Sequence, residues 1–190
     1  MEPFSENLRY EYDLNMDSVV WDVGGHQGDF ARNIIQRYGC SVVCFEPMYQ
    51  FQQAIRNQNM PGLTLIPCAL GKSTYLSTFW LQGDLSGAFA SGTPETVAVL
   101  DVASILRGAG KIDLLKLNCE GMEYDILERV LDTFLERQLC NIQVQFHTVA
   151  ANAEQRRIDI RHALSDTHKL TYEHKLTCEE PFIWENWQLV

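Results

Sequence analysis

Apolar and polar positions follow two different periods along the chain. Short runs rich in β-branched residues, typical of buried strands, occur at 19–21, 41–45 and 63–66. Stretches whose apolar residues recur every three or four positions, typical of amphipathic helices, occur at 29–38 and 48–58. Because strand and helix alternate, this order predicts a sheet of parallel strands with helices packed against it.

The rest of the chain continues this alternation and adds two hairpins. The predicted elements are an inserted β-hairpin at 74–100, a short helix after Asp101, strands at 112–118 and 140–147, helices at 121–137 and 151–165, and closing strands at 168–176 and 182–190. An alternating order that ends in a hairpin fits a class I methyltransferase core better than a second mononucleotide-binding half. We therefore predict a Rossmann-like α/β fold: a mostly parallel seven-stranded sheet with helices on both faces, a C-terminal antiparallel hairpin and a small inserted β-hairpin. Residues 1–190 are expected to form one domain, with 1–17 as a lead-in segment.

Three side-chain placements follow from the same periodicities. Phe134 is expected in the apolar stripe of its helix, and the three arginines of the 151–165 helix on its solvated face. Gln143, Gln145 and His147 alternate with apolar residues and therefore share one face of a strand. A buried polar face of this kind needs hydrogen-bond partners or a polar cavity.

The stretch from Asp22 to Gly28 has the spacing Asp-x-Gly-x-x-x-Gly between a strand and a helix. Such a turn presents backbone N–H groups to a nucleotide-like ligand. The dinucleotide pattern Gly-x-Gly-x-x-Gly is absent, because its first position would be Val23. The Asp22 carboxylate would repel a diphosphate and attract a cation. The turn therefore favours S-adenosylmethionine, an adenosyl ligand with no phosphate; the alternative is an ordinary tight turn that binds nothing.

The next strand ends in Glu46 and Pro47, and Glu46 follows Gly24 by 22 positions. This is near the offset of about 20 residues at which an acidic residue binds ribose hydroxyls; the alternative is a solvated charge. Ligands of such sheets bind beyond the carboxyl ends of the strands. The residues expected at that edge are Gly24, Glu46, Cys68, Asn118 and His147.

Composition limits the partners. The formal net charge is −10, whereas binding to a polyanion needs clustered Lys and Arg. We therefore expect a small neutral or cationic acceptor or a carbohydrate, no nucleic acid and no membrane. The N-terminus shows no signal peptide, which predicts a cytoplasmic protein. The six cysteines form no Cys-x-x-Cys pair, so we expect small core residues and no metal site.

Several motifs between about residues 18 and 147 resemble the FkbM-type S-adenosylmethionine-dependent methyltransferases. They are Asp-Val-Gly-Gly-His-Gln-Gly at 22–28, Phe-Glu-Pro at 45–47, Ala-Leu-Gly at 69–71, Ser-Gly at 86–87, and Asp-Leu-Leu-Lys-Leu-Asn-Cys-Glu-Gly-Met-Glu at 113–123. The resemblance implies O-methylation of small molecules, often sugars or polyketide-derived products, with Cys68 and Ala69 bordering the adenine. Together with the turn, the predicted cofactor contacts are Asp22, Gly24, Gly25, His26, Gly28, Glu46, Pro47, Cys68, Ala69 and Asn118.

Two positions depart from the pattern of this family. Asn118 and Gln145 stand where many relatives carry Asp and Glu, and amides cannot act as bases. This leaves open a catalytically inactive cofactor-binding module; a nicotinamide-dependent oxidoreductase is a further alternative. His147 is the first candidate for a general base and Glu120 the second. A buried structural histidine is the alternative for His147, and favourable charge at a helix N-terminus is the alternative for Glu120.

The inserted hairpin is the expected wall of the acceptor pocket, because the lead-in segment is too short to form one alone. Its apolar candidates for this wall are Phe79, Trp80, Leu85 and Phe89.

Overall fold

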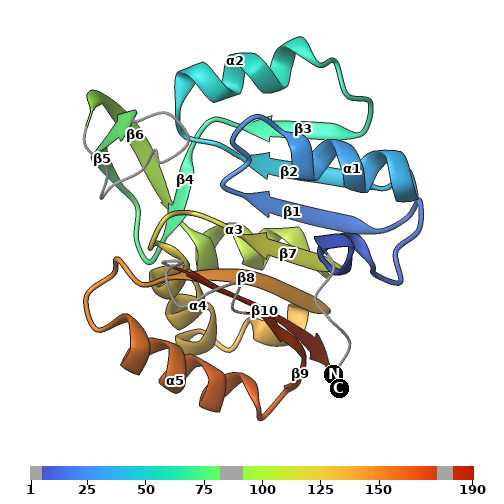
Figure 1. Cartoon of the computed structure of the whole chain (residues 1–190), viewed down its shortest axis with the longest axis vertical. Coiled ribbons are helices and arrows are strands. Elements are labelled where there is room, and N and C mark those ends of the chain that lie inside the picture. Colours follow the sequence, from blue (N-terminus) through green and yellow to red (C-terminus); the bar gives the residue numbers. More distant parts are fainter. Residues whose placement is uncertain (1–5, 82–91, 175–181) are drawn as a thin grey trace.

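A central seven-stranded sheet organises the chain in the computed structural model, which describes residues 6–81, 92–174 and 182–190. The strand order is β3-β2-β1-β7-β8-β10-β9 (Figure 1). The strands are β1 (Val19–Val23), β2 (Ser41–Phe45), β3 (Leu63–Ile66), β7 (Leu114–Leu117), β8 (Asn141–His147), β9 (His168–His174) and β10 (Phe182–Leu189). All neighbouring pairs are parallel except those of β10, which runs antiparallel to β8 and β9. The predicted fold class is thereby confirmed.

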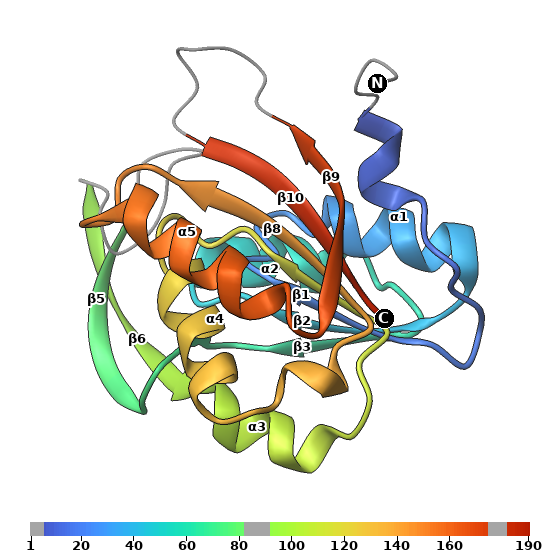
Figure 2. The same ribbon diagram turned by 90° about the horizontal axis from the view of Figure 1, so that it is seen from below.

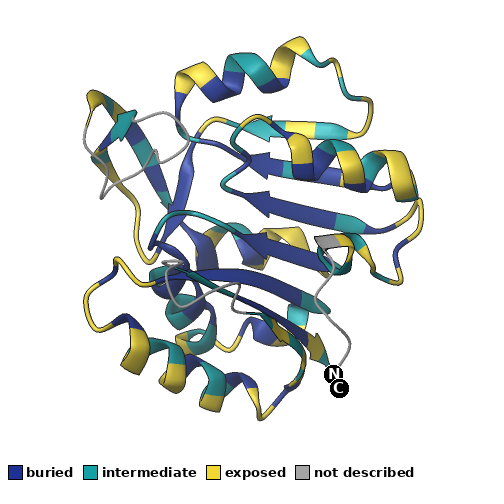
Figure 3. Cartoon of the chain, viewed as in Figure 1, coloured by how far each residue is buried: buried dark blue, intermediate teal, exposed yellow. Residues whose placement is uncertain are grey.

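Helices cover both faces of this sheet. The helices are α1 (Asp29–Tyr38), α2 (Tyr49–Asn57), α3 (Val102–Ala109), α4 (Glu123–Asp132) and α5 (Ala153–Leu164). Helices α1 and α2 lie on one face, and α3, α4 and α5 lie on the other (Figure 2). Successive residues of a strand therefore pack on opposite faces of the sheet. Val20 packs against α1, whereas Trp21 lies in the core between the sheet and α3, α4 and α5. The central strands β1, β7 and β8 are mostly buried, while the outer faces of the helices are exposed (Figure 3).

The insertion forms a second sheet of order β4-β6-β5. It consists of β4 (Ala69–Gly71), β5 (Tyr75–Leu81) and β6 (Thr93–Asp101), with β5 and β6 antiparallel as predicted and β4 an additional strand. This sheet stands at the carboxyl ends of β1, β2 and β3 (Figure 1). The predicted hairpin therefore lies at the edge where ligands bind.

Helix α4 ends at Asp132, five residues earlier than predicted. The Thr133 hydroxyl donates to the carbonyl oxygens of Arg129 and Val130, and Phe134 has a φ of 56°. The chain therefore leaves the helix, and Phe134 is exposed instead of completing the apolar stripe. A one-turn 3-10 helix, η2 (Glu136–Gln138), follows.

The arginines of α5 were also predicted wrongly as a solvated face. Arg156 pairs with Asp125 and Glu128 of α4, whereas Arg157 and Arg161 pair with Glu173 of β9 and Glu185 of β10. Glu185 is fully buried, and its carboxylate attracts the guanidinium groups of Arg157 and Arg161.

The lead-in segment covers the polar face of β8. It contains the short 3-10 helix η1 (Glu6–Tyr10). Gln143 donates to the Arg9 carbonyl oxygen at 2.8 Å and to the Tyr12 hydroxyl at 2.5 Å. Part of this face therefore finds hydrogen-bond partners rather than a cavity. No helix in the described part of the chain has the length and apolarity that crossing a membrane requires.

Candidate cofactor and active site

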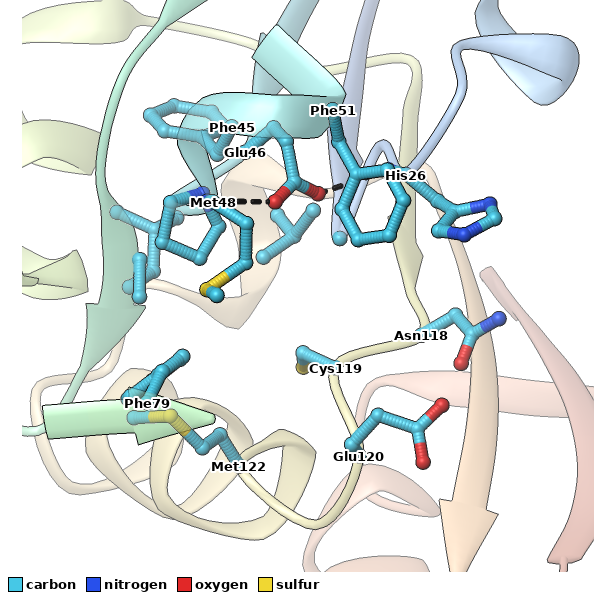
Figure 4. A pocket seen from close by; sticks show the side chains of 15 residues that line it. His26, Phe45, Glu46, Met48, Phe51, Phe79, Asn118, Cys119, Glu120 and Met122 are labelled. Atoms are coloured by element: carbon cyan, nitrogen blue, oxygen red, sulfur yellow. Dashed lines mark hydrogen bonds between the residues drawn. The ribbon is translucent and has the colours of Figure 1, made fainter. Parts of the chain in front are cut away.

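A cavity of about 240 Å³ opens at the carboxyl ends of β1, β2 and β7. The described side chains around it differ at its two ends (Figure 4). Phe79 and Met122 form an apolar end, whereas Asn118 and Glu120 project to the other side of the loop that follows β7. The cavity can therefore hold a ligand that has one flat apolar part and one polar part.

Glu46 lies at the cavity with both carboxylate oxygens bonded to the backbone. One oxygen accepts the N–H of His26 and the other accepts the N–H of Met48, each at 2.8 Å (Figure 4). Burial raises the pKa of Glu46 to about 7, although these bonds and the charge of Lys116 act in the opposite direction. Each oxygen keeps a lone pair that can accept a ligand hydroxyl.

The glycine turn approaches the loop after β7 so closely that a side chain has no room. A Cβ atom on Gly24 would lie 1.8 Å from the carbonyl oxygen of Asn118, and φ at Gly24 is 79°. The turn is held by Lys116 of β7, whose ammonium group donates to the Gly24 carbonyl oxygen at 2.8 Å and to Asp22 at 2.7 Å. The cation that faces Asp22 is therefore an internal lysine.

Glu120 is the cavity's second carboxylate, and it is connected to His147. Its φ is 53°, a left-handed conformation that non-glycine residues rarely adopt, and its side chain is 30% exposed. His147 Nε2 lies 3.5 Å from Glu120, and His147 Nδ1 lies 3.1 Å from the buried Glu123. Burial alone would lower the pKa of His147, but hydrogen bonds with Glu120 and Glu123 and their charges raise it to about 9. The ring is therefore an imidazolium at neutral pH.

The structure brings most, but not all, of the predicted residues to the cavity. Gly24, His26, Glu46, Pro47, Ala69, Asn118 and Glu120 line it. Asp22, Gly25, Gly28, Cys68 and His147 lie outside the lining. Gly25 packs against Cys44, Gly28 precedes α1 with a φ of 85°, and His147 lies behind Glu120.

The hairpin contributes Phe79 to the lining, whereas Trp80 is half-buried outside it. Leu85 and Phe89 fall outside the described residues. Of the cysteines, Cys40, Cys44 and Cys68 are buried, Cys119 and Cys140 are half-buried, and Cys178 falls outside the described residues. No group of three or more His, Cys, Asp or Glu residues suited to a metal ion occurs within the described ranges.

The lining residues that the sequence did not predict are mainly apolar. These are Val23, Phe45, Met48, Phe51, Leu70, Cys119 and Met122. Several stand directly beside a recognised motif residue, as Met48 does after Glu46-Pro47 and Leu70 after Ala69. That adjacency was the available signal.

Comparisons with known proteins agree on the fold class and the family. A family model described as "Methyltransferase FkbM domain" matches residues 22–174. A search of curated proteins found no match.

Solved methyltransferase structures resemble the chain at low sequence identity. A precorrin-6y C5,15-methyltransferase from Geobacter metallireducens GS-15 is 13% identical with a TM-score of 0.53, covering 95% of this chain and 83% of its own. An rRNA methylase from Streptococcus thermophilus is 10% identical with a TM-score of 0.58, covering 93% and 89%. TrmK from M. capricolum, in complex with S-adenosyl-homocysteine, is 12% identical with a TM-score of 0.53, covering 93% and 64%. At these identities, the likeness shows the fold.

Proposed function

The chain belongs to the FkbM methyltransferase family, and we propose that it transfers the methyl group of S-adenosylmethionine to an oxygen atom of a small molecule or carbohydrate. The observation that carries this proposal is the pair of carboxylates, Glu46 and Glu120, that line one cavity at the carboxyl edge of the sheet. The first suits the ribose of the cofactor, and the second suits the hydroxyl of an acceptor.

The described residues fit this cofactor in two respects. The side-chain oxygen of Asn118 is buried without a hydrogen-bond partner, so it can accept a bond from a ligand ammonium or hydroxyl group. Glu46 keeps unused lone pairs, and the neighbouring Met48, Leu70 and Phe79 offer an apolar surface for a flat ring. When bound, S-adenosylmethionine supplies an activated methyl group on a positively charged sulfur.

The residues of this chain would act mainly by positioning the acceptor. An acceptor oxygen must lie about 3 Å from the methyl carbon and in line with the bond that breaks. Glu120 can take the hydroxyl proton while the new oxygen–carbon bond forms, and the electron pair of the broken bond stays on the sulfur. In this assignment Glu120 replaces His147 as the base, because His147 lies behind it and is already protonated.

Charge supports a neutral or cationic acceptor. The net charge is −10, and no Lys or Arg is among the described residues that line the cavity. An anionic acceptor would be repelled by Glu46 and Glu120 and would find no Lys or Arg among the described lining residues to pair with. A carbohydrate or another polyol fits this setting, because its hydroxyl groups donate hydrogen bonds to carboxylates.

Thermal unfolding with candidate ligands tests the choice of cofactor. S-adenosylhomocysteine at 100 times its Kd should stabilise the chain by about 2.7 kcal/mol and raise Tm by about 5–10 °C. NAD should leave Tm unchanged, because the dinucleotide glycine spacing is absent. A Tm increase with NAD and none with S-adenosylhomocysteine would contradict the proposal.

A methyl-transfer assay tests the choice of acceptor. Labelled S-adenosylmethionine is incubated with neutral monosaccharides and methyl glycosides, and with the matching sugar phosphates as controls. Label should enter an O-methyl group of a neutral compound. Cofactor binding without transfer to any hydroxyl acceptor would favour the alternative of a catalytically inactive cofactor-binding module. The amides at Asn118 and Gln145 support that alternative.

A further inference from the structure

The loop that carries Glu120 is tied to β8 by one buried carboxylate. Glu123, the first residue of α4, is fully buried. One of its oxygens accepts the backbone N–H of His147 at 2.7 Å and lies 3.1 Å from the ring Nδ1. Its other oxygen accepts the backbone N–H of Gly121 at 2.9 Å. Glu123 therefore holds both the histidine and the turn directly after Glu120.

This arrangement fixes the direction in which the His147 ring faces. Because Nδ1 is directed at Glu123, Nε2 is left to face Glu120 at 3.5 Å. The ring is 5% exposed and packs edge-on against Phe182, with ring centres 6.0 Å apart. Its position is therefore set from three sides, by Glu123, Glu120 and Phe182.

Two carboxylates are the titratable groups that face this ring among the described residues. Glu120 comes from the loop after β7 and Glu123 from α4, while the Tyr124 hydroxyl donates to the backbone carbonyl oxygen of His147. Neither carboxylate has a Lys or Arg partner within the described residues. The protonated form of the imidazole is their counter-ion, which agrees with a pKa of about 9.

The backbone at Glu120 needs this support. Its φ of 53° and the φ of 102° at Gly121 form a left-handed turn. A non-glycine residue keeps such a conformation only when its surroundings hold it. The Glu123–Gly121 bond supplies that restraint, and the turn directs the Glu120 side chain to the same side of the loop as Asn118, away from Cys119 (Figure 4).

From these contacts we infer that Glu123 and His147 are positioning residues, which hold Glu120 toward the methyl acceptor as an ionised carboxylate. This inference rests on the proposed function. His147 contributes a positive charge and a fixed N–H, and Glu123 orients that charge. Neither touches the acceptor. The hydroxyl proton goes to Glu120 alone, so the proton on His147 stays in place throughout.

The protonation state of His147 gives a direct test that needs no acceptor. In protein with ¹⁵N-labelled histidine and saturated with S-adenosylhomocysteine, the ring nitrogens of His147 should titrate near pH 9. His147→Gln identifies the signals among the five histidines. Glu120→Gln and Glu123→Gln should each shift the titration to lower pH, because each removes a negative charge next to the ring.

Glu128→Gln is the matched control. It makes the same substitution on the same helix, at a carboxylate that pairs with Arg156 and has no contact with His147. It should leave the titration of His147 unchanged. If Glu123→Gln does not fold, Glu120→Gln carries the test alone, because the Glu120 side chain is part-exposed.

Kinetics separate positioning from direct proton transfer. With neutral methyl glycosides as acceptors, turnover of the native chain should fall above about pH 9, where His147 loses its proton. If neutral His147 were the base, turnover would rise through the same range.

Glu123→Gln should lower kcat about 10-fold or more, since a general base contributes about 10²–10⁴-fold. The KM of the acceptor and the Kd of S-adenosylhomocysteine should stay within about two-fold, and Glu123→Asp should recover part of the rate.

The results distinguish the two proposals. A His147 titration near pH 6.5, or turnover that rises through pH 9, would overturn the positioning roles while leaving methyl transfer intact. Absence of S-adenosylhomocysteine binding would instead overturn the proposed function.

Discussion

At the scale of single residues, the cavity depends on carboxylates whose surroundings give them different roles. Glu46 is buried with two backbone N–H groups, and its pKa is raised to about 7 mainly by burial. Glu120 is part-exposed and faces an imidazolium. Glu123 is fully buried and accepts bonds from four groups of the chain. These differences underlie the roles that we propose for the three carboxylates: ribose binding, proton transfer and positioning.

Glu46 leads to a prediction about pH. Ribose hydroxyls donate hydrogen bonds to the ionised carboxylate, so binding favours ionised Glu46 and releases a proton. With a pKa of about 7, the ionised fraction falls about ten-fold from pH 8 to pH 6. Calorimetry should therefore show about ten-fold weaker binding of S-adenosylhomocysteine at pH 6 than at pH 8, with proton release near pH 7.

The variant Glu46→Gln is the control for this effect. It should bind S-adenosylhomocysteine more weakly at pH 8, because it lacks the charge-assisted bonds, and should respond little to pH between 6 and 8. An unchanged pH response in this variant would assign the effect to another group.

At the scale of elements, neighbouring elements complete one another's hydrogen bonds. The first turn of α2 contains no acidic residue, and Glu95 of β6 accepts the backbone N–H of Tyr49 there. This bond ties the second sheet to the segment directly after Glu46. The lead-in does the same for β8 by covering Gln143. The inserted sheet therefore stabilises a segment that lines the cavity, and the lead-in stabilises β8.

Strand β8 offers a matched pair of substitutions. Gln143 and Gln145 are both buried on one face of the strand, but only Gln143 donates side-chain hydrogen bonds to described residues. The side-chain oxygen of Gln145 is buried and has no hydrogen-bond partner among the described residues. Gln145→Met should raise the free energy of unfolding by about 1 kcal/mol, whereas Gln143→Met should lower it by about 1–3 kcal/mol. Urea unfolding measures both, and equal effects of the two would contradict this account of the face.

At the scale of the whole molecule, many of the positive charges are neutralised internally. Arg156, Arg157 and Arg161 pair with carboxylates of α4, β9 and β10, and Lys116 is buried beside Asp22. Because the chain already carries a net charge of −10, these pairs leave an acidic exterior. This net charge opposes binding to a phosphate backbone, which requires clustered free cations.

We therefore predict that the chain does not bind RNA. Fluorescence anisotropy with a labelled tRNA transcript in 150 mM KCl should give a Kd weaker than about 10⁻⁴ M, the weak limit of non-specific binding. Micromolar binding that weakens steeply with added salt would contradict the prediction and point to an RNA substrate.

Local patterns in the sequence predicted the main helices and strands, the glycine turn and the position of Glu46, but not strand β4. Helix α1 and strand β3 have the predicted bounds, because periodicity and a following glycine are local signals. Gly24 and Glu46 lie at the cavity because parallel strands place their carboxyl ends on one edge, whichever side chains fill the core. Strand order placed Asn118 at the same edge, and the family motifs added Ala69.

Which charged side chains pair depends on the tertiary structure, because the two members of each pair are distant in the chain. Lys116 and Asp22 are 94 positions apart, and His147 and Glu123 are 24 apart. Periodicity placed the arginines of α5 in solvent, yet buried Glu185 and the carboxylates of α4 and β9 attract them inward. Strand order ranked His147 ahead of Glu120 as the base, yet Glu120 lines the cavity and His147 does not, because the left-handed turn at Glu120 sets where that side chain lies. Local rules fix backbone elements, whereas the pairing of charges depends on the burial that only the packed chain creates.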